Sequence, residues 1–226
     1  MTKPKVVGVV PAAGRALRLQ PLPCSKEVLP VGGRPVLDYL VERMRAAPCD
    51  ELRVVTRPEK RDVVERATEL GALVVEGHPP WVADSLLLGM EGLARDDVVL
   101  FGFPDSIWEP LDGFAHLLAA LGEEDEVVLG LFSTRELERS DVVVLDELGR
   151  VAEIHVKPGH PPSDLVWGCL AGRVSALEGV RGYDEPGAYL DRLARGRSVQ
   201  AVRFGTEFVD IGTPQALLRH VDVVPS

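Results

Sequence analysis

The stretch VVGVVPAAGRALRLQPLPCSKEVLPVGGRPVLDYL, residues 6–40, decides the fold. It opens with an apolar run at residues 6–10, which predicts a buried strand because β-branched side chains suit a pleated surface. Small residues follow at positions 12–14, and an apolar-periodic helix begins at Pro35. Between them lie three cations: Arg15, Arg18 and Lys26. Small residues let backbone amides approach a ligand closely and cations balance negative charge, so this loop is a candidate phosphate site.

Beyond this stretch, short β-branched runs alternate with amphipathic segments. The alternation predicts right-handed crossovers and an α/β fold, with a mixed, mostly parallel sheet and helices on both faces. The predicted strands cover residues 6–10, 53–56, 73–75 and 97–103, and the predicted helices cover 36–46, 59–70 and a segment from about 82. Such a sheet binds ligands beyond the carboxyl ends of its strands, where the phosphate loop lies.

From residue 126 the pattern changes to strands with fewer helices. We expect this half to extend the same sheet and to supply the pocket for a second substrate. The predicted elements are strands at 127–132, 166–172, 199–204 and 208–211, a hairpin over 142–156, helices at 174–177 and 188–195, and a last helix from Pro214 to about His220.

Composition narrows the class of protein. With 226 residues and 46% hydrophobic composition, the chain can bury a full core, and we expect one domain over residues 1–226. A net charge of −10 argues against binding to nucleic acid or to a membrane surface, which requires an electropositive face. Three scattered cysteines indicate neither a disulfide framework nor a thiolate metal site. Without a signal peptide or a membrane-length apolar run, we expect a cytoplasmic protein, with homo-oligomerisation left open.

Four places could carry chemistry, and each has a plainer interpretation. The opening loop could hold a triphosphate, or it could be a solvated, arginine-rich turn. Asp105 follows the most apolar strand, where a carboxylate can bind a divalent cation or cap the next helix. Asp210 follows another apolar strand and has the same two interpretations. Lys157 could hold a sugar phosphate, or it could be a solvated lysine at a strand end.

The joint occurrence of these places decides between the interpretations. In order, the chain contains AAG at 12–14, RLQP at 18–21, SKEVLPV at 25–31, FGFPD at 101–105, VAEIHVKP at 151–158, VWGCLAG at 166–172 and FVDIGTPQALL at 208–218. Over about the whole chain, these segments resemble the motifs of the sugar-1-phosphate nucleotidylyltransferases, the NDP-sugar pyrophosphorylases. The resemblance implies their Rossmann-like, nucleotide-diphospho-sugar transferase type of fold.

The resemblance also implies a reaction and a set of site residues. A sugar-1-phosphate oxygen attacks the α-phosphorus of a nucleoside triphosphate, pyrophosphate leaves, and Mg²⁺ is the cofactor. By match to the family's motifs, the residues are Ala13 and Gly14 for the nucleotide, Arg18 and Lys26 for catalysis and triphosphate binding, Lys157 and Gly168 for the sugar phosphate, and Asp105 and Asp210 for the metal.

Several positions depart from the family pattern. The family's second glycine is Ala16, its threonine or serine is Leu17, and the proline before its lysine is Ser25. Where relatives have a base-reading glutamine and Gly-Leu-Ala, this chain has His78 and the run from Trp81 to Asp84. The glutamate before the second lysine is Val156, and a Tyr-Gly pair is Ser140-Asp141. Asp141 could face an amino sugar or be a turn residue, and we favour the turn.

These departures leave a second hypothesis open, a non-catalytic nucleotide or nucleotide-sugar sensor of the same fold. A dinucleotide oxidoreductase is a weaker third, because about twenty residues separate Gly14 from the next predicted helix, too many for the dinucleotide-binding turn. We expect no β-helix acyltransferase domain like the one that some relatives carry after the last helix.

Overall fold

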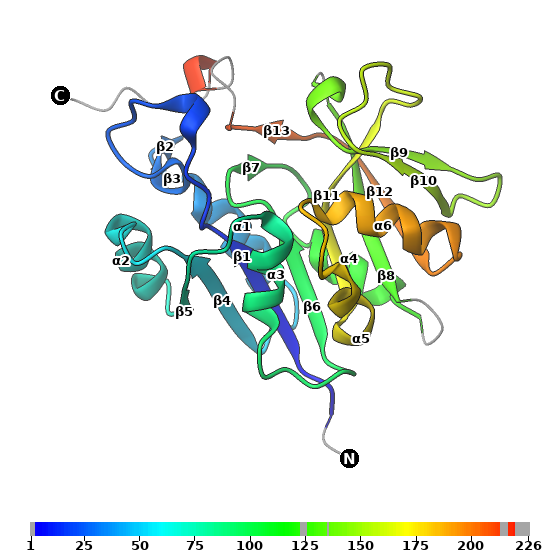
Figure 1. Cartoon of the computed structure of the whole chain (residues 1–226), viewed down its shortest axis with the longest axis horizontal. Helices are drawn as coiled ribbons and strands as arrows, with labels where there is room; N and C mark the ends of the chain where they lie inside the picture. The colour runs from blue at the N-terminus through cyan, green and yellow to red at the C-terminus, as the bar shows by residue number, and fades with distance from the viewer. Residues whose placement is uncertain (1–2, 123–125, 135, 213–216, 220–226) are drawn as a thin grey trace.

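A nine-stranded mixed sheet forms the centre of the protein (Figure 1). The computed structural model describes residues 3–122, 126–134, 136–212 and 217–219. One half of the sheet is parallel and consists of β1 (Val6–Pro11), β4 (Glu51–Thr56), β5 (Leu73–Glu76) and β6 (Val98–Gly102). Their order is β6, β1, β4, β5, and each neighbouring pair runs parallel. The apolar β-branched runs of the sequence thus form the buried centre of the sheet, as predicted.

The second half of the chain extends the same sheet. The long strand β11 (Leu165–Arg173) lies antiparallel to both β6 and β8 (Val127–Ser133). Beyond β8 lies β12 (Val199–Glu207), which runs parallel to it. A hairpin of β9 (Val142–Leu145) and β10 (Val151–His155) pairs with the start of β11. This is the hairpin predicted over 142–156, and its turn contains Gly149, whose φ of 78° favours glycine.

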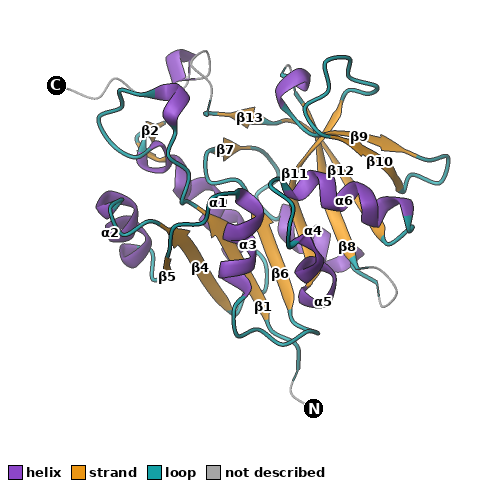
Figure 2. Ribbon diagram, viewed as in Figure 1, coloured by secondary structure: helices purple, strands orange, loops and turns teal. Residues whose placement is uncertain are grey.

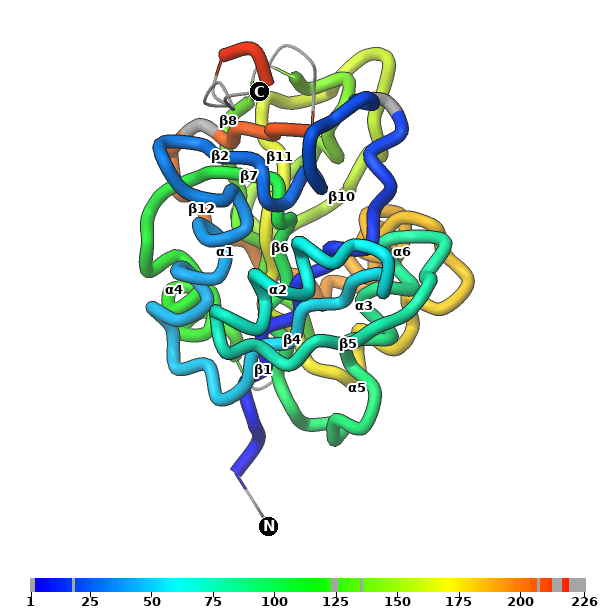
Figure 3. The backbone as a smooth tube through the Cα atoms, turned by 90° about the vertical axis from the view of Figure 1, so that its left-hand side faces the viewer, coloured from blue at the N-terminus to red at the C-terminus, as the bar shows by residue number. Residues whose placement is uncertain are grey.

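Helices cover both faces of the sheet (Figure 2). One face packs against α1 (Val36–Arg45), α2 (Arg61–Glu69) and α4 (Gly113–Ala120). The other face packs against α3 (Val82–Met90), α5 (Val174–Leu177) and α6 (Pro186–Arg195). Figure 3, turned by 90°, shows α1 and α4 on one side of the strands and α3, α5 and α6 on the other. The predicted α/β architecture is confirmed.

Two small sheets stand apart from the main one. A tight hairpin joins β2 (Pro30–Val31) to β3 (Arg34–Pro35), and β7 (Ser106–Ile107) pairs antiparallel with β13 (Val209–Asp210). The sequence predicts extended structure at 208–211 but gives no sign of β7, because two residues carry no period. The predicted start of the last helix at Pro214 and its end at His220 lie outside the described residues, while residues 217–219 are helical.

Candidate active site

A cavity of about 1140 Å³ opens at the carboxyl ends of β1 and β6. Its walls come from the loop after β1, the segment before α3, and the residues that follow β6. Of the predicted site residues, it is lined by Ala13, Gly14, Lys26, Asp105, Lys157 and Asp210. A second cavity of about 450 Å³, at the amino ends of β4 and β5, is lined by none of them. The fold therefore brings most of the predicted site to one place.

The loop after β1 is held by two cations that follow β4. Lys60 Nζ donates to the carbonyl oxygens of Ala12, at 2.7 Å, and Gly14, at 3.1 Å. Arg57 Nε donates to the carbonyl oxygen of Ala13 at 2.7 Å. With these carbonyls bound, the amides of Gly14 and Arg15 donate to no other residue in the described part of the chain. The loop thus offers free amides to an anion, as a phosphate site requires.

Ala16 has a left-handed backbone conformation, which glycine favours, and the family pattern has a glycine at this position. Its φ is 50° and its ψ is 36°, in the left-handed region, just before the short 3₁₀ helix η1 (Leu17–Leu19). A Cβ makes this conformation costly for alanine, and only glycine adopts it freely. The loop therefore has, at an alanine, a turn that glycine would adopt without strain. Arg18 lies in η1, and its side chain is outside the described part.

Two carboxylates and a lysine meet beside this loop. Lys26 Nζ lies 2.5 Å from Asp105 Oδ2, and a Cβ placed on Gly14 would be 4.0 Å from the same ammonium. β7 and β13 lie side by side (Figure 1), and their pairing brings Asp210 alongside. The Ile211 amide donates to the Asp105 carbonyl at 2.8 Å.

Gly212 allows the two carboxylates to converge. A Cβ there would lie 2.9 Å from Asp105 Oδ2 and 2.8 Å from Asp210 Oδ1, closer than real Cβ contacts permit. The Gly212 amide donates to Asp210 Oδ1 at 2.7 Å, which holds that carboxylate in place. The glycine of the FVDIGT segment is therefore needed for space, next to the charged groups.

The electrostatics of this cluster favour a bound cation. Burial and repulsion by Asp105 raise the pKa of Asp210 to about 6. Burial opposes the charge on Lys26, but attraction to Asp105 and Glu27 outweighs it and raises the pKa of Lys26. Two converging carboxylates suit Mg²⁺, which proteins commonly hold with one or two carboxylates and substrate phosphates. The described residues hold no group of three or more histidine, cysteine or acidic side chains arranged for a metal.

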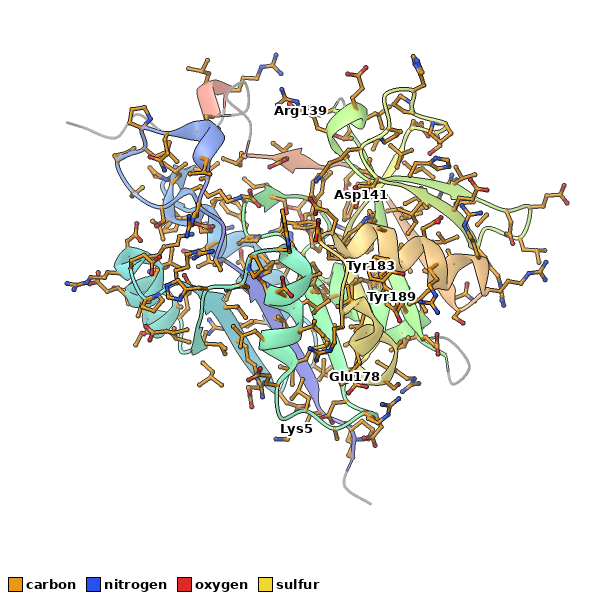
Figure 4. All side chains as sticks on the ribbon, in the orientation of Figure 1. Lys5, Arg139, Asp141, Glu178, Tyr183 and Tyr189 are labelled. Carbon is orange, nitrogen blue, oxygen red and sulfur yellow. The ribbon has the colours of Figure 1, made fainter. Side chains whose placement is uncertain are left out.

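Lys157 also lines the cavity. It has a φ of 43°, and its ammonium pairs with Glu185 at 2.5 Å while the side chain stays half-exposed. Asp141, just before β9, accepts a hydrogen bond from the Trp167 indole at 3.2 Å, and its other oxygen is buried with no partner among the described residues (Figure 4). Burial raises the pKa of Asp141 to about 6, against the attraction of Lys157. Asp141 is thus more than a turn residue.

Gly168 does not line the cavity. It lies within β11, where a Cβ would be 2.3 Å from Phe208 and 3.0 Å from Phe132. Core packing therefore accounts for this glycine, and its predicted role toward the sugar phosphate stays a prediction.

Sequence reasoning did not identify three of the residues that shape the loop. Arg57 and Lys60 act on backbone carbonyls, and the fully buried Glu27 forms an ion pair with Lys60 at 2.5 Å. One signal was present: the segment TRPEK places two cations directly after a strand that neighbours β1. In a parallel sheet, the ends of neighbouring strands meet at one edge, so these cations reach the loop.

The comparisons with known proteins point to one family. A family model described as a MobA-like NTP transferase domain matches residues 8–192. The chain is 26% identical to a glucose-1-phosphate thymidylyltransferase of Neisseria meningitidis, over 93% of this chain and 79% of that protein. It is also 26% identical to a UTP–glucose-1-phosphate uridylyltransferase of Haloferax volcanii, over 92% of this chain and 91% of that protein.

A solved structure shows the same fold. The crystal structure of a UDP-glucose pyrophosphorylase complexed with UDP-glucose matches with a TM-score of 0.79 and 17% identity, over 96% of this chain and 97% of that one. In the described residues, every helix is too short or too polar to cross a membrane.

Proposed function

The chain belongs to the MobA-like NTP transferase family, and from this premise we propose that it transfers a nucleoside monophosphate from a nucleoside triphosphate to a sugar-1-phosphate. The relatives named above act on glucose-1-phosphate, which supports a sugar phosphate as the acceptor. One observation carries the proposal. The phosphate loop and Lys26 belong to one segment near the start of the chain, Asp105 and Asp210 come from distant segments, and all line the same cavity.

The reaction needs charge neutralisation more than proton transfer. An oxygen of the sugar phosphate attacks the α-phosphorus, a new P–O bond forms, and the bond to the bridging oxygen breaks as pyrophosphate leaves with the electron pair. The nucleophile is already an anion, so no general base is required. The protein must bring two anions together and absorb the charge that develops on the leaving group.

The residues of the cavity can divide this task. The free amides of Gly14 and Arg15 would bind triphosphate oxygens, and Arg18 in η1 would contribute a cation on the same side. Lys26, beside Gly14, would neutralise charge on the α-phosphate. Asp105 and Asp210 would hold Mg²⁺, which supplies positive charge to the phosphate oxygens when bound.

Lys157 would hold the phosphate of the sugar. Its half-exposed ammonium faces the cavity, and the partner that it now has, Glu185, is itself 37% exposed, so exchanging this surface ion pair for a phosphate costs little. The ammonium and the phosphate loop would then place the two substrates on opposite sides of the α-phosphorus.

The proposal is tested by measuring pyrophosphate release with four nucleoside triphosphates, a set of sugar-1-phosphates and Mg²⁺. We expect release with at least one pair and only when both substrates are present. Tight nucleotide binding without turnover for any pair would reject the enzyme in favour of the non-catalytic sensor.

A substitution at Lys26 tests its assigned role. Lys26→Ala should lower kcat by on the order of 10² to 10³, the loss expected for one preorganised charge contact. Lys5→Ala is the matched control, because Lys5 is an exposed lysine at the amino end of β1, far from the cavity (Figure 4). An unchanged rate in folded Lys26→Ala, checked by circular dichroism, would remove Lys26 from the mechanism.

A further inference from the structure

Trp81 is an exposed tryptophan on the wall of the cavity. Its side chain is 52% exposed, whereas Trp108 and Trp167, the other two tryptophans of the chain, are 2% and 3% exposed. Trp108 and Trp167 pack against phenylalanine rings, but the Trp81 indole makes no ring contact with any described residue. The cavity wall therefore presents an exposed aromatic face, which is a surface on which a planar ligand can stack.

The backbone around Trp81 is held firmly. Two prolines precede it, and the amide and hydroxyl of Ser85 donate to its carbonyl oxygen at 3.1 and 3.3 Å. Arg57 joins this segment to the phosphate loop, because its Nη2 donates to the Pro79 carbonyl at 3.1 Å while its Nε holds the Ala13 carbonyl. The backbone of Trp81 is therefore held relative to the loop before any ligand arrives, so binding need not order this segment.

Both charged and apolar residues line the cavity. Lys26, the paired carboxylates and Lys157 contribute charge, whereas Pro80 and Trp81, just before α3, and Val82, its first residue, contribute apolar surface. A nucleoside triphosphate has the same division, with a charged tail and a planar base.

We propose that Trp81 stacks on the base of the bound nucleoside triphosphate. This inference rests on the proposed function and names the residue that receives the base. Stacking uses the π-face that every base has, so it contributes affinity with little discrimination between bases. The protein should therefore accept more than one nucleoside triphosphate. The glycine of the family pattern has no side chain that could supply this contact.

The single exposed tryptophan makes the inference measurable by fluorescence. Addition of ATP, GTP, UTP or dTTP, with Mg²⁺ and without sugar phosphate, should quench the tryptophan emission as the base covers the indole. Inorganic tripolyphosphate, which has no base, should compete with the nucleotide for the loop and cause no quenching of its own.

Three variants separate stacking from indirect effects. Trp81→Phe keeps an aromatic face, so it should bind nucleotide within about threefold of the natural protein but without the quenching. Trp81→Ala should weaken nucleotide binding roughly 5- to 100-fold, the range for loss of one base–aromatic stack, and leave tripolyphosphate affinity unchanged. Leu148→Ala, an exposed apolar residue in the β9–β10 turn, is the control and should behave like the natural protein.

The outcomes are distinct. Quenching that persists in Trp81→Phe, or nucleotide binding by Trp81→Ala at natural affinity in calorimetry, would overturn the stacking role. If the stacking role is overturned but pyrophosphate release is normal, the proposed function stands without a stacking role for Trp81. If no nucleoside triphosphate binds at all, both proposals fail together.

Discussion

At the scale of single residues, the left-handed backbone of Ala16 lowers the stability of the folded protein. A left-handed conformation is unfavourable for a residue with a Cβ, by about 1 kcal/mol or more. We expect Ala16→Gly to raise the free energy of unfolding by roughly 0.5–1 kcal/mol, since the strain is larger than the added entropy of the unfolded chain. Urea denaturation measures this change.

A second alanine provides a control, because its substitution should change the free energy of unfolding in the opposite direction. Ala119 lies exposed in α4 with ordinary helical geometry, so Ala119→Gly should lower the free energy of unfolding by about 0.5–1 kcal/mol. If Ala16→Gly and Ala119→Gly lower the free energy of unfolding by the same amount, the turn at Ala16 is not strained.

Asp141 gives a prediction about pH. Folding raises its pKa from 3.8 to about 6, chiefly through burial, so the folded protein binds more protons than the unfolded chain between these pH values. The free energy of unfolding should therefore fall as pH rises through this range. Asp141→Asn cannot ionise. Relative to the natural protein, it should gain about 1–3 kcal/mol between pH 4 and pH 7.

Denaturation curves of both proteins at pH 4 and pH 7 measure this gain. The pair at pH 4 serves as the reference, because in the folded proteins both side chains are then largely neutral. Curves that shift in parallel between the two pH values would show that Asp141 ionises as readily in the folded protein as in the unfolded chain.

At the scale of elements, the buried pair of Glu27 and Lys60 joins η2 (Lys26–Val28) to the start of α2 and to the phosphate loop. Removing one partner leaves an unpaired buried charge, so Lys60→Met should lower the free energy of unfolding by about 3 kcal/mol or more. The double variant Lys60→Met/Glu27→Leu removes both charges and should regain most of that loss.

Nucleotide binding should not recover with stability. In the double variant the carbonyls of Ala12 and Gly14 still lack their donor, so the KM for the nucleoside triphosphate should stay raised roughly tenfold, the size of one lost charged hydrogen bond. If KM returns with stability, Lys60 serves the fold and has no part in shaping the loop.

The elements also show where prediction from sequence succeeds. Long apolar runs such as residues 6–10 and 97–103 predict their strands well, because burial on both faces leaves a continuous signal. The pairing of β7 with β13 has no such signal, yet it is what brings Asp105 and Asp210 together. The motif resemblance predicts the two carboxylates, but their convergence depends on the space beside Gly212, which only the structure shows.

The same contrast holds within the site. Ala13, Gly14 and Lys26 were predictable because they belong to one contiguous segment with a charge pattern. Arg57 and Lys60 were not predicted. Their place directly after a strand is a signal, but nothing in the sequence shows that they bind backbone carbonyls of a neighbouring loop. Trp81 and Asp141 were visible only as departures from a family pattern. The structure adds that Trp81 is exposed on the cavity wall and that the carboxylate of Asp141 is buried.

At the scale of the whole molecule, the family model and the relatives confirm the resemblance to sugar-1-phosphate nucleotidylyltransferases that the motifs predicted. The single domain over residues 1–226, the cytoplasmic location and any self-association stay predictions. The roles assigned to individual residues are proposals for experiment. All of them depend on one central claim, that the cavity joins a nucleotide to a sugar phosphate.

The fate of each phosphate tests that claim most directly. The protein is incubated with Mg²⁺, a sugar-1-phosphate and a nucleoside triphosphate labelled with ³²P at the α-position or, in a parallel reaction, at the γ-position. We predict that the α-label appears in a nucleoside diphosphate sugar and the γ-label in pyrophosphate, in equal amounts. Label that stays in the triphosphate for every sugar phosphate, or γ-label released as inorganic phosphate, would contradict the account.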